Sequence, residues 1–231
     1  MLRSGNVSRW VTPLLSVIAI GAMSACTSTS SGGTASATAD MQVAQGSQEQ
    51  VLLGRKLVIN HDCAGCHGGS NPADKGWLAG VMSPDQEFHI GPCSLANPTA
   101  KPCFVTRPRN LTPDNSTGLG RFTERQIFNA LRFGLRPEET PDVEITSMTP
   151  GQGNFPANPR YLAIPMPWIA WRHMSDQELR AIAAYLHRGL KPVSNKVLDS
   201  EGPPDFWASF YTVEKIGPFP SPAFPTANER Q

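Results

Sequence analysis

The chain has 231 residues, and its 20 Lys+Arg against 19 Asp+Glu give a net charge of +1. Phosphate backbones are bound by a clustered excess of basic residues, so this balance excludes nucleic acid as the main partner. Charged residues make up 17% of the chain, against about 25% in ordinary domains, beside 20 glycines and 22 prolines. With 39% apolar residues, the composition predicts a small globular protein with long loops.

The N-terminal residues have the pattern of an export signal. Arg3 and Arg9 precede an apolar run over residues 11–23. That run is shorter than the ~20 residues that a membrane-spanning helix needs. We therefore assign residues 1–25 to a signal peptide and place the mature protein outside the cytoplasm.

Two ways of processing that signal are open. The residues before Cys26 resemble a bacterial lipoprotein box, although Met23 stands where leucine is usual. In that case Cys26 is lipidated, and residues 26–46, rich in small residues, form a flexible tether on the periplasmic side of a bacterial membrane. Ordinary cleavage nearby would instead leave a soluble periplasmic protein.

A helix is predicted over residues 48–60, directly before a cysteine motif. Gly54 lies inside this helix, where glycine costs about 1 kcal/mol relative to alanine. A close crossing by another helix would explain it, because a missing side chain lets a second backbone approach. Tyr185, on the last predicted helix, is the expected partner.

Cys63-Ala64-Gly65-Cys66-His67 follows that helix. This C-x-x-C-H spacing is the pattern of covalent c-type haem attachment. Each thiol can add to one of the two vinyl groups of the haem. The adjacent histidine then lies beneath the haem iron as its proximal ligand. A thioredoxin-like redox pair would need a βαβ context, and zinc would need a second ligand cluster. We predict one covalent haem c, bound by Cys63, Cys66 and His67.

The next part of the chain, residues 68–109, is a loop-rich insert. It contains Cys93 and Cys103, which in an oxidising compartment most simply form a disulfide. The alternative is two free thiols, one of them an axial iron ligand. Three side chains of the insert could contact haem propionates: Trp77, Arg107 and Arg109. For each of the two arginines, a solvated position at the surface is at least as good an interpretation.

The second iron ligand must come from further along the chain. Met166 stands between Pro165 and Pro167, which hold an extended backbone that can aim one thioether with little entropy to lose. A methionine between two prolines cannot lie inside a regular helix. Met166 is therefore the predicted distal ligand, with Met148, a histidine or a vacant position as alternatives. Sulfur ligation raises the reduction potential.

Two further helices are predicted from capping boxes. One begins after Thr123 and ends at Gly134, and the other begins after Ser175 and ends at Gly189. Met174 immediately precedes the second box, where it should pack on its own helix as a hydrophobic staple.

The C-terminal extension, residues 196–231, is rich in proline and aromatic residues. It either wraps its own domain or docks on a partner, since aromatic side chains are favoured at interfaces.

Several segments, taken together, carry a family resemblance: Gly54–Val58, Cys63–His67, Asn110–Asp114, Gly118–Gly120, Ala130–Gly134, Pro165–Pro167 and Met174–Leu179. Through them, residues 47–195 resemble the cytochrome c domains in cytochrome subunits of periplasmic alcohol, aldehyde and sugar-acid dehydrogenases. The resemblance implies an all-α cytochrome c fold, with three to four helices around one haem, proximal His67 and distal Met166. Those subunits often carry three haem domains, whereas this chain has one C-x-x-C-H.

These patterns predict an exported mono-haem c-type cytochrome that is not itself an enzyme. It would transfer single electrons from a periplasmic dehydrogenase to the respiratory chain, with a cytochrome or terminal oxidase as the acceptor. The alternative is a haem enzyme or sensor, peroxidase-like or thiosulfate-oxidising, whose sixth iron position is open or exchangeable. A non-haem redox or metal lipoprotein is a third hypothesis.

Overall fold

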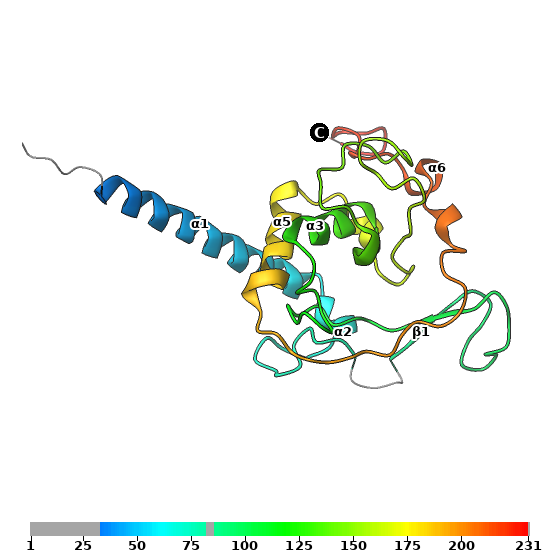
Figure 1. Cartoon of the computed structure of the whole chain (residues 1–231). Coiled ribbons are helices and arrows are strands. Elements are labelled where there is room, and N and C mark those ends of the chain that lie inside the picture. The colour runs from blue at the N-terminus through cyan, green and yellow to red at the C-terminus, as the bar shows by residue number, and fades with distance from the viewer. Residues whose placement is uncertain (1–32, 82–85, 231) are drawn as a thin grey trace, which may run out of the picture. The chain divides into compact units, whose positions relative to one another are not determined.

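The computed structural model describes residues 33–81 and 86–230, with side chains from residue 47 onward (Figure 1). The predicted signal peptide and Cys26 lie outside this range. The chain divides into two compact units, Met1–Asp40 and Met41–Gln231, and the fold and site described below belong to the second. Within the described ranges, no helix combines the length and hydropathy that a bilayer crossing requires.

The three predicted helices are present. Helix α1 spans Gly33–Asn60 and so includes residues that we expected to form a flexible tether. Helix α3 spans Glu124–Phe133, and α5 spans Asp176–Ala184. After α5 the chain continues as one π-helical turn, η2 (Tyr185–Gly189). The helix thus ends at Gly189 as predicted, but its last turn is wider than that of an α-helix.

Both capping boxes are formed. The Thr123 hydroxyl accepts from the Gln126 N–H, while the Gln126 side chain accepts from the Thr123 N–H. Ser175 and Glu178 make the same reciprocal pair at the start of α5. Gly134 ends α3 in the left-handed conformation, with φ of 68°, which glycine adopts without a side-chain penalty.

The helices pack as the glycine in α1 predicts. A Cβ atom placed on Gly54 would overlap the Ala181 carbonyl and would lie 2.8 Å from Cβ of Tyr185. The backbones of α1 and α5 therefore touch at this point, and the predicted crossing is confirmed. Helices α3 and α5 lie side by side in Figure 1.

The remaining elements are short: α2 (Cys63–His67), β1 (Phe88–Ile90), β2 (Phe104–Thr106), η1 (Pro137–Glu139), α4 (Trp168–Trp171), η3 (Ala208–Phe210) and α6 (Val213–Ile216). Strands β1 and β2 pair antiparallel, with His89 opposite Val105. This small sheet departs from the all-α expectation, although the chain is otherwise helical and loop-rich. The predicted Cys93–Cys103 disulfide is present and closes the loop between the two strands.

Buried apolar side chains form two clusters. The first joins α1, α3 and α5 and includes Val58, Leu131 and Leu179. The second contains residues of α4 and of the C-terminal extension, including Trp168 and Trp207, which are both fully buried. The extension thus packs on its own domain at Trp207, as one of the two sequence interpretations expected.

Replacing Gly54 with alanine tests the helix crossing. Helix propensity alone would favour alanine by about 1 kcal/mol, whereas steric overlap with the backbone of α5 is expected to cost about 2 kcal/mol or more. Denaturant unfolding should therefore show a clear loss of stability. Gly76→Ala is the matched control, because a Cβ there meets nothing within 4 Å. Equal stability of the two variants would contradict a tight crossing.

Candidate functional site

The C-x-x-C-H segment forms the single helical turn α2, directly after α1. Ala64 is buried in the first cluster, while Cys66 is exposed and Cys63 is partly buried. Gly65 is exposed and lies against the Asp62 carboxylate, which would have to move if a Cβ were added there. The turn therefore packs on the core through Ala64, while both thiols are free.

His67 is oriented by one hydrogen bond. Its Nδ1 lies 2.7 Å from the carbonyl oxygen of Arg109. Because a carbonyl can only accept, Nδ1 carries the proton and Nε2 keeps its lone pair. Burial lowers the pKa of His67, which also favours the neutral imidazole. A histidine held through one nitrogen, with the other free, is the usual arrangement of a metal-binding histidine.

The carbonyl that orients His67 is itself held by a buried polar network around Asn110. The Asn110 side-chain oxygen accepts from the N–H and the hydroxyl of Thr112, at 2.9 and 2.8 Å. Its amide nitrogen donates to the Val193 carbonyl at 2.7 Å and to the Thr117 hydroxyl at 3.0 Å. The sequence marked Asn110 only through the family resemblance. In the structure, Asn110 ties the segment that carries the Arg109 carbonyl to the segment after η2.

Two observations weigh against the other interpretations of Cys63 and Cys66. Burial raises the pKa of the Cys63 thiol to about 12, which disfavours the thiolate that thiol–disulfide exchange requires. Among the described residues, three potential metal-ligand side chains do meet elsewhere, at His89, Cys93 and Cys103. Two of these are joined in the disulfide, so their sulfurs are not thiolates.

Met166 and Met148 lie in different parts of the core. Met166 is partly buried and packs against the first cluster, as Cys63 does. Met148 packs against the second cluster. Met166 lies in a turn outside any helix, in which its N–H donates to the Ala163 carbonyl at 2.9 Å. The structure thus brings Met166 and one cysteine of the motif to the same cluster.

The three side chains proposed to contact propionates have other partners. The Trp77 indole N–H donates to the Tyr185 hydroxyl at 3.0 Å. Arg107 is buried and pairs with Glu87 at 2.6 Å, so a solvated role for it is wrong. The Arg109 guanidinium donates to the Leu198 carbonyl at 3.0 Å. Arg107 also donates to the Asp199 carbonyl at 3.0 Å, so both arginines bind the insert to later parts of the chain.

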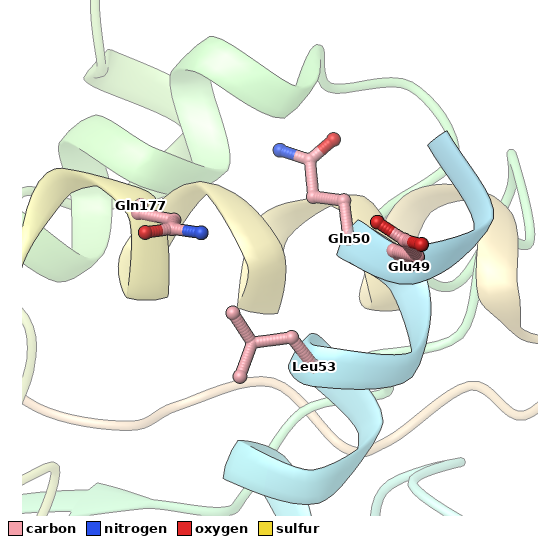
Figure 2. Close-up of a pocket in the computed structure, with 4 residues that line it drawn as sticks. All are labelled: Glu49, Gln50, Leu53 and Gln177. Atoms are coloured by element: carbon pink, nitrogen blue, oxygen red, sulfur yellow. The ribbon is translucent and has the colours of Figure 1, made fainter. Parts of the chain in front are cut away.

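Figure 2 shows a surface pocket between α1 and α5. Its lining residues are Glu49, Gln50, Leu53 and Gln177. None of these is a cysteine, histidine or methionine, so this pocket is separate from the candidate site on α2.

Several known proteins are similar in sequence to this chain. The chain is 26% identical over 143 residues to the fructose dehydrogenase cytochrome subunit of Gluconobacter japonicus. It is 26% identical over 161 residues to the gluconate 2-dehydrogenase cytochrome c subunit of Pantoea cypripedii. It is 31% identical over 96 residues to the cytochrome c subunit of the quinone alcohol dehydrogenase of Gluconobacter oxydans. The chain is similar to dehydrogenase cytochrome c subunits.

The similarity covers only part of each relative. The three matches span 62%, 69% and 41% of this chain, but 22%, 27% and 16% of the relatives. This chain therefore corresponds to about a quarter or less of the length of these cytochrome subunits. No family model matches the chain. The resemblance read from the sequence motifs is confirmed by these relatives.

Asn110→Ala tests the network behind His67. Removing this side chain leaves the Thr112 N–H without its acceptor, and leaves the Val193 carbonyl with only the 3.2 Å bond from the Thr112 hydroxyl, at an expected cost of about 2–3 kcal/mol in unfolding free energy. Asn158→Ala is the matched control, because Asn158 is exposed and its side chain makes no hydrogen bond to the described residues, and it should change stability by less than about 0.5 kcal/mol. Both values can be measured by urea denaturation, and equal effects at the two sites would contradict the buried network.

Proposed function

We propose that this protein is an exported single-haem c-type cytochrome that transfers electrons. Haem would be attached through Cys63 and Cys66, with His67 and Met166 as the iron ligands. The donor set fits this group: two thiols on one turn, an imidazole and a thioether. The observation that carries the proposal is the 2.7 Å contact from His67 Nδ1 to the Arg109 carbonyl, which leaves Nε2 free on the turn that bears both thiols.

The side chains assigned to the iron suit electron transfer more than bond-making chemistry. Bound haem supplies an iron that cycles between the ferric and ferrous states. His67 is held by the Arg109 carbonyl, and Met166 is held by the first cluster and by its own turn. Ligands fixed in this way stay in place in both oxidation states, which keeps the rearrangement on electron transfer small.

The partners and location follow from the relatives and the leader sequence. Three similar proteins are named as cytochrome subunits of dehydrogenases. We infer that the electron donor is a dehydrogenase and that the acceptor is a cytochrome or terminal oxidase. The N-terminal pattern supports export, with a lipid on Cys26 as the anchor on the periplasmic side of the membrane.

Met166→Ala tests the distal ligand. In the haem-loaded protein, this change should abolish the weak near-infrared absorption band of sulfur-ligated ferric iron and lower the reduction potential. Met148→Ala should retain both properties, because Met148 packs in the other cluster.

The opposite pattern in the two variants would assign the sulfur ligand to Met148. A wild-type protein without the band that readily binds cyanide or carbon monoxide would instead support the haem enzyme or sensor.

Replacing Cys63 and Cys66 together with serine tests covalent attachment. The matured double variant should carry no haem that survives denaturation, as read by intact mass and by a pyridine haemochrome assay. Cys93→Ser with Cys103→Ser is the control, since these sulfurs form the disulfide and should not be needed for attachment. Wild-type protein that is colourless after expression with the maturation machinery would favour the non-haem hypothesis.

A further inference from the structure

We propose that the C-terminal extension positions the sulfur ligand of the iron by clamping the short helix α4, which begins two residues after Met166. The inference rests on the proposed function, in which Met166 binds iron, and it adds a role for residues that are distant in sequence. Helix α4 is a single turn, Trp168–Trp171. A helix of this length has no stability of its own, so its position depends on what holds its two ends.

The first end is held by Trp168. Its side chain is fully buried, and its ring lies 5.1 Å from that of Tyr211 in the extension and 6.1 Å from that of Tyr161. Gly134 makes room for the indole, because a Cβ there would overlap the ring. The backbone N–H of Trp168 donates to the Met166 carbonyl at 2.9 Å. Packing at Trp168 therefore constrains the backbone of the methionine directly.

The second end is held by Arg172, whose side chain is 1% exposed. Its Nη2 donates to the carbonyls of Gly217 and Pro218 in the extension, at 2.8 and 2.9 Å. The backbone N–H of Arg172 donates to the Trp168 carbonyl at 2.8 Å and closes the helical turn. Hydrogen bonds from a buried cation are stronger than those between neutral groups, so these carbonyls are a firm attachment.

The extension adds further contacts at the same end. The Phe219 ring lies 5.6 Å from Cζ of Arg172 and 5.9 Å from the His173 ring. The Ser221 hydroxyl lies 2.5 Å from Nδ1 of His173. Residues 217–221 thus contact both residues that follow α4, the buried Arg172 and the exposed His173.

These contacts prepare the methionine for binding before the iron–sulfur bond forms. Fixing a free backbone costs conformational entropy, and a turn that is already fixed avoids that cost at the moment of binding. Loss of the clamp should let the Met166 turn open more often. An open turn exposes the sixth iron position to small external ligands, while haem attached through Cys63 and Cys66 stays in place.

Two truncations of the haem-loaded chain test the clamp. Ending the chain after Thr212 removes Gly217–Ser221 but keeps Trp207 and Tyr211. Ending it after Ala223 removes only the end of the extension, including the exposed Phe224, and is the matched control.

We expect the shorter chain to lose part of the near-infrared sulfur–iron band. It should also bind carbon monoxide about tenfold faster, in proportion to the population of the open turn. The control should match the full chain in both measurements, and all three proteins should show the same covalent haem content.

A full-length variant separates the loss of these contacts from any misfolding caused by truncation. Phe219→Ala with Ser221→Ala should also speed carbon monoxide binding, whereas the exposed Phe224→Ala should not. An unchanged band and unchanged rates in the Thr212 truncation and in this double variant would overturn the clamp while leaving the proposed function intact. A full-length protein with no covalent haem or no sulfur–iron band would overturn the proposed function, and the clamp with it.

Discussion

The contact between the backbones of α1 and α5 at Gly54 is the constraint on which the rest of the structure depends. It brings the Ala181 carbonyl against α1 and sets the helix that bears Tyr185 beside the segment that leads to α2. The hydrogen bond from Trp77 to Tyr185 then attaches the start of the insert to the same place. The turn with the two thiols is thereby fixed to a rigid pair of helices, which a covalent cofactor site needs.

Much of the chain outside those helices is irregular, and buried polar side chains do the work that regular hydrogen bonding does elsewhere. Asn110, Arg107 and Arg172 all donate to backbone carbonyls of segments far along the chain. A buried loop must satisfy its backbone polar groups individually, since no neighbouring strand or helix does so. In this protein the same bonds hold the groups assigned to the iron, His67 through the Arg109 carbonyl and Met166 through α4.

The C-terminal extension belongs to this system and is more than a covering of the surface. Asp205 accepts from Arg136 at 3.0 Å and from Arg160 at 2.8 Å, and so joins the extension to the chain on either side of the Met148 loop. Trp207 lies against Phe104 of β2, with ring centroids 4.9 Å apart. The extension thus links the insert, the second cluster and α4, which makes it part of the domain that carries the proposed haem.

Features that depend on neighbouring residues could be determined from the sequence alone. The caps at Thr123 and Ser175, the end of α3 at Gly134 and the turn of the C-x-x-C-H motif each involve residues within about four positions of one another. The need for a close approach at Gly54 was also visible, because a glycine inside a helix requires a reason.

Only the tertiary structure decided the rest. It paired β1 with β2, assigned Asn110 to the carbonyl of Val193, and directed the guanidinium of Arg172 to Gly217 rather than to solvent. Each of these depends on a partner that the chain brings close only after folding. A hydrogen bond across such a separation leaves no periodic or local pattern in the sequence, because its geometry is set by the packing of the elements between the two residues.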